Sequence, residues 1–254
     1  MEKMYWTFQI TPIAEGQIAA AGEMLARAFF NDPLCVYAQP DPAARLSQFG
    51  WVFSRLIREG ASQQSAYVST FVRQPHGVAV WAPPQAGEPT VSEVPGSEME
   101  QWEQRLGPGA YHRFTTAYRH FEHIHHRCMA GPHWYLGLLG VSPGLQRHGI
   151  GSALLAPVLR RADQDGLPCH LETFAPENVP FYQRHGFQVA HAGTEPLSGI
   201  RYWAMARGPS PPRTRRASPG PRLASTRRRP HQEQAGCRYT VMATGEGVRL
   251  AGGR

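Results

Sequence analysis

The spacing of hydrophobic and polar positions divides residues 1–207 into alternating helix-like and strand-like segments. Apolar residues recur every three or four positions in stretches typical of amphipathic helices, and they alternate or run together in shorter stretches typical of strands. The pattern predicts helices over 14–30, 43–58, 98–105, 111–126, 150–165 and 179–185. It predicts strands over 5–12, 66–72, 77–81, 133–142, 168–174, 187–191 and 201–206. This alternation, with about seven strands and several helices, predicts an α/β fold.

Particular residues mark the ends of these segments. The pair Asp32-Pro33 is expected to stop the first helix, and Gly60 is a candidate C-cap for the second. Residues 74–77, Gln-Pro-His-Gly, predict the turn between two strands. The strand over 133–142 is so apolar that neither of its faces is expected to meet water.

The basic character of the chain is concentrated after position 207. Residues 208–254 carry ten Arg and two Glu, a net charge of +8, whereas residues 1–207 have a net charge of −1. The tail has few large apolar residues and cannot offset its ordering entropy by burial. We therefore expect one folded domain over 1–207 and a disordered, dispensable Arg/Pro/Gly-rich tail over 208–254, in which only 239–242 could pair as a short strand. The alternative for the tail is an electrostatic arm; for the folded body we expect no nucleic-acid partner.

Bulk features favour a soluble protein of the cytoplasm. The longest apolar run, about 134–141, is far shorter than the ~20 residues of a membrane helix, so no membrane partner is expected. The first residues lack the apolar core of a signal peptide. Four cysteines are widely spaced without a CxxC pair, which argues against a disulfide framework: Cys35, Cys128, Cys169 and Cys237. Residues 85–97 are rich in proline and glycine and predict a loop.

A group of histidines raises the question of a metal site. Its members are His120, His123, His125, His126, Cys128 and His133. Zinc sites usually combine four ligands at fixed short spacings, and no such spacing recurs here. We expect no metal, and we expect these side chains to lie at exposed helix ends or in a substrate cleft.

The segment 138–155 carries the most informative chemistry. An apolar strand ends at Pro143, and a short loop then enters a helix through Gly149 and Gly151. Glycine allows positive φ and close approach of a ligand. The first N–H groups of a helix have no internal partner and form an anion site suited to a pyrophosphate. The spacing fits neither the dinucleotide fingerprint nor the P-loop.

The pattern Gln146-x-x-Gly149-x-Gly151, placed after Val-x-Pro, resembles the acetyl-CoA motif of the GNAT superfamily of N-acetyltransferases. Residues 171–187, which end Tyr-x-x-x-Gly-Phe, look like the second motif of that superfamily. The form Leu-Glu-Thr followed by Asn-x-Pro-Phe-Tyr is similar to the branch that contains puromycin N-acetyltransferase, and so is 78–81 followed by prolines.

This resemblance implies a mixed seven-stranded sheet that splays between its fourth and fifth strands, with acetyl-CoA as co-substrate in the gap. It places the cofactor-binding groups on two segments and one further residue: Leu139, Gly140, Val141, Gln146, Arg147, His148, Gly149, Ile150, Gly151, Ser152 and Asn178. A main-chain N–H near 139–141 would stabilise the oxyanion. Asn178 stands four residues before Tyr182, whereas many members of the superfamily have six, and the shorter spacing fits the branch that contains puromycin N-acetyltransferase.

Two side chains are the candidates for proton transfer. The resemblance places Tyr182 beside the sulfur as the acid; the alternative is a core aromatic whose hydroxyl bonds to backbone. Glu172 lies between apolar neighbours in a strand and is the candidate base; the alternatives are a salt bridge to an arginine, or a water relay in its place. A lysine-like amine, with a pKa of ~10.4, loses its proton at pH 7 at a cost of about 4–5 kcal/mol, so a base is essential for it.

We therefore expect an acetyl-CoA-dependent N-acetyltransferase acting on a small-molecule primary amine, with amino-nucleosides and other antibiotics among the candidates. The alternatives are a peptide or protein N-acetyltransferase and a non-catalytic acyl-CoA-binding module. Substrate contacts are expected near 29–42 and 81–84. Oligomeric state is open, a homodimer included.

Overall fold

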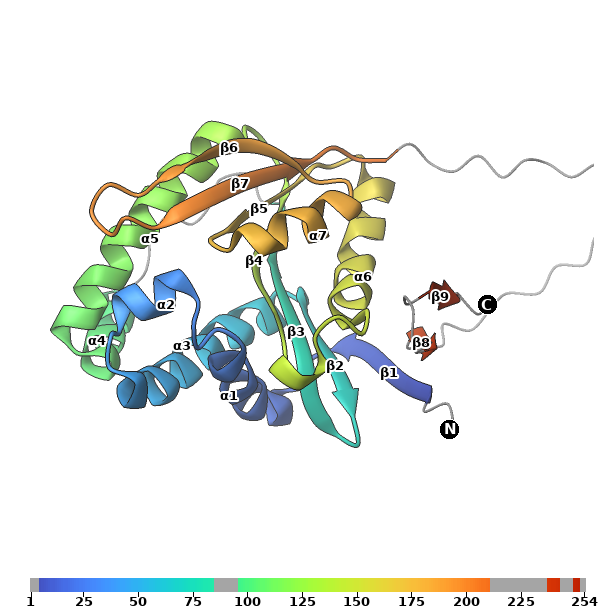
Figure 1. The fold of residues 1–254 in the computed structure, drawn as a ribbon, viewed down its shortest axis with the longest axis horizontal. Coiled ribbons are helices and arrows are strands. Elements are labelled where there is room, and N and C mark those ends of the chain that lie inside the picture. Colours follow the sequence, from blue (N-terminus) through green and yellow to red (C-terminus); the bar gives the residue numbers. More distant parts are fainter. Residues whose placement is uncertain (1–4, 85–95, 211–236, 243–248, 252–254) are drawn as a thin grey trace, which may run out of the picture.

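The computed structural model describes residues 5–84, 96–210, 237–242 and 249–251 (Figure 1). Its first seven strands are β1 (Tyr5–Pro12), β2 (Ala66–Phe71), β3 (Gln74–Ala82), β4 (Trp134–Val141), β5 (Cys169–Thr173), β6 (Gln188–Thr194) and β7 (Arg201–Arg207). The helices are α1 (Ile18–Ala28), α2 (Pro33–Ala38), α3 (Pro42–Ser62), α4 (Gly96–Leu106), α5 (Pro108–Cys128), α6 (Ile150–Asp165) and α7 (Val179–Arg184). Short 3-10 turns are η1 (Glu15–Gln17), η3 (Pro143–Leu145) and η4 (Pro176–Asn178).

The seven strands form one mixed sheet in the order β6-β7-β5-β4-β3-β2-β1. Neighbouring strands are antiparallel, except for the parallel pair of β4 and β5. That pair is joined only at Trp134↔Cys169 and Tyr135↔His170. Beyond these two positions the strands separate, so the predicted mixed sheet and its splay between the fourth and fifth strands are confirmed.

A bulge in β4 lies directly after the last paired position. Trp81 is opposite Leu136 and Val80 is opposite Leu138, so Gly137 is the extra residue. Gly137 is exposed, and the next two leucines are half-buried. The expectation that neither face of this strand meets water is therefore wrong. The reason is that the splay leaves the β5 side of β4 unpaired where the bulge bends it away.

Helices cover both faces of the sheet (Figure 1). On one face α6 and α7 bury a core that includes Leu154, Trp134 and Leu136. On the other face α1 and α3 bury a second core around Leu25 and Phe53. α5 packs against β5 and β7 on this second side. Strand side chains alternate between the two cores, as the pleat requires.

Of two predicted helix ends, the one at Asp32-Pro33 is confirmed and the one at Gly60 is wrong. Asp32-Pro33 does end the first helix, but it also begins α2, because the Asp32 carboxylate caps it by accepting from the N–H of Leu34 at 2.9 Å. Gly60 lies inside α3, which continues to Ser62. A side chain at Gly60 would collide with Val80, so its glycine serves close packing of α3 on β3 rather than a helix end.

The turn between β2 and β3 also differs from the prediction. The turn residues are Val72 and Arg73, with φ of 49° and 63°, and residues 74–77 belong to β3. Two positive φ values are typical of the tight hairpin turn that matches strand twist. These residues lack the glycine or asparagine that normally signals such a turn, which explains the misplacement.

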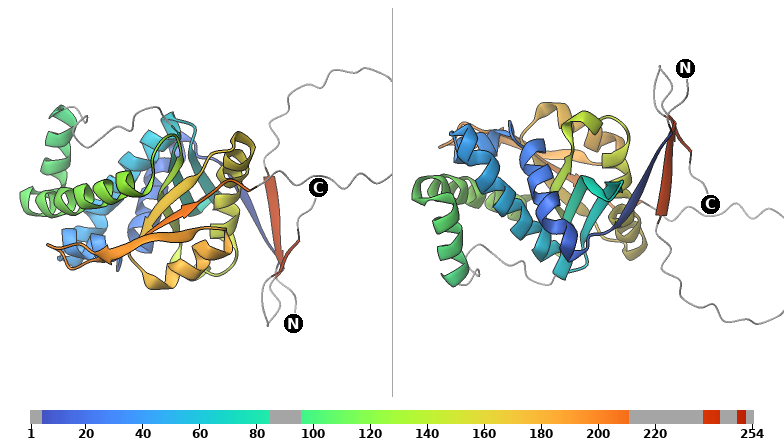
Figure 2. Two further views of the ribbon diagram at one scale, coloured as in Figure 1. Left: turned by 90° about the horizontal axis from the view of Figure 1, so that it is seen from above. Right: turned by 90° about the horizontal axis from the view of Figure 1, so that it is seen from below.

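Two further strands come from the region after position 207. β8 (Cys237–Met242) pairs antiparallel with β1, and β9 (Arg249–Ala251) pairs with β8, which extends the sheet to nine strands. Figure 2 shows β8 in red beside β1 in dark blue. The possible short strand over 239–242 corresponds to β8. Residues 211–236, 243–248 and 252–254 lie outside the described part, as do 85–95 of the predicted loop, so the tail boundary stays a prediction. Among the described helices, none is both long and apolar enough to cross a membrane.

Candidate active site

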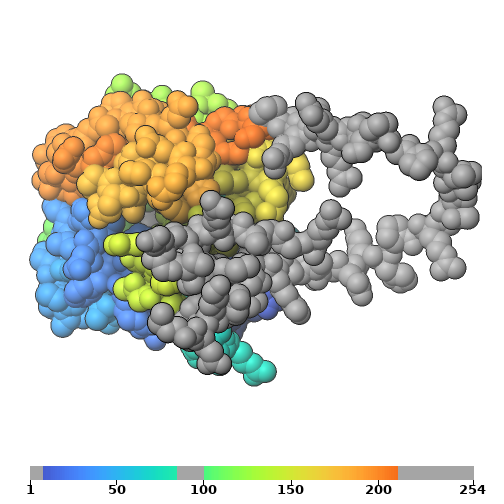
Figure 3. Space-filling model, turned by 45° about the vertical axis from the view of Figure 1, so that its right-hand side comes forward, coloured from blue at the N-terminus to red at the C-terminus, as the bar shows by residue number. Residues whose placement is uncertain are grey.

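The loop between β4 and α6 brings most of the predicted cofactor residues together. Positions 139–141 end β4, and 146–152 form the loop and the first turn of α6. Gly149 is the N-cap in the left-handed region, with φ of 80°, and Arg147 has a φ of 64°. The backbone therefore turns sharply into a sixteen-residue helix whose first N–H groups have no intrahelical acceptor. Figure 3 shows this yellow-green segment at the surface between the blue N-terminal helices and the orange C-terminal part.

Side chains within this loop hold its shape. The Gln146 amide donates to the carbonyl of Val141 at 3.3 Å, and His148 Nδ1 donates to the carbonyl of Gln146 at 2.7 Å. Gln146 and Arg147 are exposed, so the guanidinium of Arg147 is accessible to an anion. The structure thus gives Gln146 a loop-stabilising role and leaves positive charge beside the start of α6.

Two of the candidate glycines also lie in close packing contacts. A Cβ on Gly140 would collide with Leu25 of α1 and with Phe29, which follows this helix. A Cβ on Gly151 would approach Phe181 of α7 to 3.2 Å, a tight contact rather than a collision. Packing therefore favours glycine at Gly140 without a ligand, and neither glycine is by itself evidence for cofactor binding.

Tyr182 lies on α7 in the core beneath this loop. Its side chain packs between Phe181 and Phe187, with ring centroids at 5.1 and 6.0 Å, and the residue is 7% exposed. Burial raises the pKa of its hydroxyl, which keeps the proton in place at neutral pH. Within the described part of the chain this hydroxyl makes no hydrogen bond, so the alternative of a backbone-bonded core tyrosine does not describe it.

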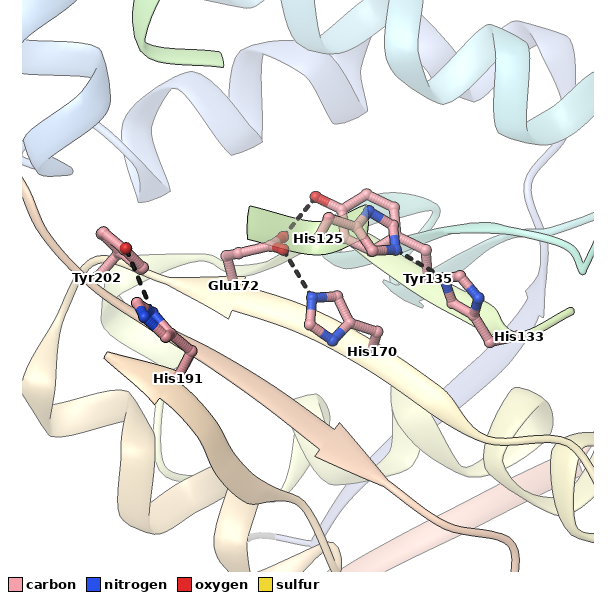
Figure 4. Close-up of polar contacts among 7 residues, drawn as sticks. All are labelled: His125, His133, Tyr135, His170, Glu172, His191 and Tyr202. Carbon is pink, nitrogen blue, oxygen red and sulfur yellow. Dashed lines mark hydrogen bonds and ion pairs between the residues drawn. The ribbon is translucent and has the colours of Figure 1, made fainter. Parts of the chain in front are cut away.

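Glu172 is buried on β5 with both carboxylate oxygens engaged (Figure 4). The Tyr135 hydroxyl donates to Oε2 at 2.8 Å, and His170 Nε2 is 2.7 Å from Oε1. The Glu172 side chain is 3% exposed. Among the described residues no arginine pairs with it, so the alternative of a salt bridge to arginine does not hold. Tyr135 and His170 are not among the predicted site residues.

The two proton-transfer candidates lie on opposite faces of the sheet. Along β5, Leu171 belongs to the core that contains Tyr182, whereas His170 and Glu172 point toward α5. Asn178 is on the Tyr182 side, where its amide donates to Thr173 Oγ1 at 3.2 Å. β4 and β5 separate between these two faces, beyond the pair Tyr135↔His170.

The members of the predicted histidine group that lie on α5 are split between its exposed and its buried sides. His123 and His126 are exposed, whereas His125 is buried and its Nε2 is 2.6 Å from Nε2 of His133. His133 Nδ1 donates to the carbonyl of Gly131 at 2.8 Å, so its Nε2 accepts a hydrogen bond from His125 Nε2. Burial and the nearby histidines lower the pKa of His125 to about 3, and it is neutral at physiological pH. Within the described ranges no group of side chains is arranged to hold a metal ion.

Two hollows lie near the place where β4 and β5 separate. A cavity lies between α3 and α5 and is lined by residues that include Tyr135, His125, His133 and Gly137. A groove lies between α2 and the ends of β5 and β7, and it includes Tyr37 and Trp203. The predicted substrate segments 29–42 and 81–84 contribute to the groove and the cavity, respectively.

Comparison with known proteins agrees with this geometry. The profile of the Acetyltransferase (GNAT) family matches residues 109–187. An uncharacterised N-acetyltransferase of Schizosaccharomyces pombe is 26% identical over 192 residues, which cover 66% of this chain and 69% of that protein.

Solved structures share the fold. The histone acetyltransferase HPA2 and related acetyltransferase of Corynebacterium glutamicum matches with a TM-score of 0.57 at 21% identity, over 82% of this chain and 100% of that one. The polyamine N-acetyltransferase of Drosophila melanogaster, which forms N-acetylagmatine, matches with 0.55 at 16% identity, over 79% and 99%. Arylalkylamine N-acetyltransferase 2 of Aedes aegypti matches with 0.54 at 10% identity, over 79% and 98%. At these identities the likeness is one of fold.

Proposed function

We propose that this chain, which carries a GNAT acetyltransferase domain over residues 109–187, is an acetyl-CoA-dependent N-acetyltransferase whose acceptor is a small-molecule primary amine. The acetyl-CoA diphosphate would lie against the start of α6, held by the 146–152 loop, and the pantetheine arm would follow the unpaired edge of β4 at 139–141. The left-handed turn at Gly149 and the exposed charge of Arg147 support this placement. Asn178 would contribute from the α7 side.

In this mechanism one face of the sheet supplies the base and the opposite face supplies the acid. The amine approaches from the α5 side, and Glu172 takes up its proton. The neutral nitrogen attacks the thioester carbonyl in the gap, where a β4 main-chain N–H stabilises the oxyanion. Tyr182, on the opposite face, gives its proton to the departing sulfur. The raised pKa of Tyr182 suits an acid that must stay protonated until the thiolate forms.

The observation that carries the choice of a small acceptor is the cavity beside Tyr135. Four elements wall it in, namely α3, β3, α5 and β4, and the tyrosine on its wall is hydrogen-bonded to the buried carboxylate of Glu172. A peptide acceptor would need an open groove at this place. The fold is compatible with amine chemistry, since the polyamine and arylalkylamine enzymes share it.

The test is a coenzyme A release assay on a panel of acceptors. The panel contains polyamines, arylalkylamines, puromycin as the representative of the amino-nucleoside branch, and a short peptide with a free N-terminus. We expect turnover with a small amine and none with the peptide; preference for the peptide would contradict the proposal. Calorimetry with acetyl-CoA, run in parallel, identifies a non-catalytic binding module as binding without turnover.

Glu172→Gln tests the base within the same assay. We expect kcat/KM to fall by roughly 10²–10⁴-fold, most strongly at low pH, because the acceptor is then protonated and needs a base. Glu103→Gln, an exposed carboxylate on α4, is the matched control and should behave like the unmodified enzyme. A pH profile that Glu172→Gln leaves unchanged would exclude Glu172 as the base.

A further inference from the structure

The buried carboxylate of Glu172 is separated from the cavity where we place the acceptor. Its side chain is 3% exposed, and it is not among the residues that line the cavity. Tyr135 does line the cavity, and its hydroxyl donates to Glu172 Oε2 at 2.8 Å. A tyrosine hydroxyl therefore stands between the acceptor position and the carboxylate, as Figure 4 shows for the two side chains.

We propose that Tyr135 is a further catalytic residue, which passes the proton of the acceptor to Glu172. The inference rests on the proposed function. The acceptor ammonium gives one proton to Tyr135 Oη as the original hydroxyl proton moves to Glu172 Oε2. One N–H bond and one O–H bond break, and two O–H bonds form. The products are a neutral amine, an unchanged tyrosine and a protonated Glu172, so the ammonium and carboxylate charges cancel.

His170 completes this arrangement as a positioning residue. Its ring is fully buried, its Nε2 lies 2.7 Å from Glu172 Oε1, and it stacks on His125 with centroids 4.5 Å apart. The two carboxylate oxygens are thus each fixed by one neighbour. Oε2 is directed at Tyr135 rather than free to rotate, which is the preorganisation that proton transfer requires.

Other ionisable groups face this site from the surrounding elements. They are His125, Glu122 and Cys128 on α5, His133 before β4, Glu59 on α3 and Tyr202 on β7. His125, the group stacked closest to His170, has its pKa lowered to about 3 and stays neutral through the range in which an acceptor amine titrates. The pH dependence expected of the relay therefore belongs to the acceptor amine.

Tyr135→Phe tests the relay with the best acceptor from the panel. The variant keeps the ring that packs against His125 and removes only the hydroxyl. We expect kcat/KM at pH 7 to fall by about 10²–10⁴-fold for an alkylamine, with acetyl-CoA affinity unchanged. The deficit should shrink about tenfold for each pH unit toward the amine pKa of ~10.4, because solvent then supplies the neutral amine.

The matched control is Tyr67→Phe. Tyr67 packs against the α6 core, and within the described part of the chain its hydroxyl has no hydrogen-bond partner, so its loss should leave the pH profile unchanged. A double variant with Glu172→Gln gives a second readout. If both residues act in one proton path, the double variant should be no slower than the slower single variant.

The relay would be overturned if Tyr135→Phe lowered kcat/KM by the same factor at every pH, or if the effects of the two substitutions added in the double variant. The hydrogen bond between Tyr135 and Glu172 would then have a structural role only. Undiminished turnover would overturn it as well. In each case the unmodified enzyme still acetylates the acceptor, so the proposed function stands. Absence of turnover by the unmodified enzyme across the whole panel is the different result that overturns both.

Discussion

The site residues are distinguished by where the sheet places their side chains. Glu172 and Tyr182 are both buried, yet one faces α5 and the other packs in the core beside α6. Because they lie on opposite faces, the proposed base and the proposed acid cannot exchange a proton directly. Each can therefore keep the protonation state that its own step requires, provided that the reacting carbonyl lies in the gap between them.

Tyr182→Phe tests the acid half of this arrangement. The variant loses a hydroxyl that makes no hydrogen bond to any described residue and keeps the ring that packs on Phe181 and Phe187, so we expect little change in stability. We expect kcat to fall roughly 10²-fold or more, with little change in acetyl-CoA affinity. The measurement is a single-turnover rate beside a melting curve. Undiminished turnover at every pH would remove Tyr182 from the mechanism.

At this scale the sequence identifies charged candidates better than it identifies their partners. A carboxylate between apolar neighbours is conspicuous, and Glu172 was found that way. Tyr135 looks like an ordinary strand residue, because its contact with Glu172 depends on the parallel register of β4 and β5. This hydrogen bond joins positions 37 residues apart, and no local pattern encodes it. His170 stands two positions before Glu172 on the same strand, so the two-residue period of a strand could have placed it beside the carboxylate.

Among the elements, long periodic helices and buried strands were predicted well, and short or irregular ones were not. α6 and β1 have the predicted bounds, because each carries a full apolar pattern. α2 has six residues, too few to show helical periodicity, and its cap Asp32 was interpreted as a stop. The partly exposed stretch of β4 was missed because its hydrophobic residues have the same sequence pattern as core residues.

The cap of α2 makes a prediction about stability. Burial raises the pKa of Asp32 to about 6, against 3.8 in the unfolded chain. The folded protein therefore binds this proton more tightly, and the contribution to stability is present below pH 3.8 and lost as pH rises through 6. Asp32→Asn should remove this dependence, which amounts to about 1–3 kcal/mol. Urea unfolding between pH 4 and 7 measures it.

Asp41→Asn is the control for that measurement. Asp41 caps α3 in the same way, accepting from the N–H of Ala43 at 3.0 Å, but it is exposed. Its replacement should leave the slope of unfolding free energy against pH between 4 and 7 close to that of the unmodified protein. Equal slopes for Asp32→Asn and the unmodified protein would contradict the assignment.

For the whole molecule, the question is whether the C-terminal region takes part in catalysis. Every candidate site residue precedes position 208, and β1, the strand that β8 joins, is at the far edge of the sheet from the gap. The folded body closes with Arg207, whose guanidinium pairs with Asp163 at 2.8 Å, and with Ser210, whose N–H donates to the same carboxylate at 2.8 Å. A cut after Ser210 therefore leaves these contacts intact.

Truncation after Ser210 should leave acetyl transfer within about twofold of the full chain, because no catalytic contact is removed. It should lower the melting temperature slightly, because β1 loses its pairing with β8 along one edge while it keeps β2 on the other. The assay is coenzyme A release beside a melting curve with and without acetyl-CoA. If turnover is lost while acetyl-CoA still stabilises the truncated protein, the tail contributes to acceptor binding, and the boundary at 207 does not delimit the functional enzyme.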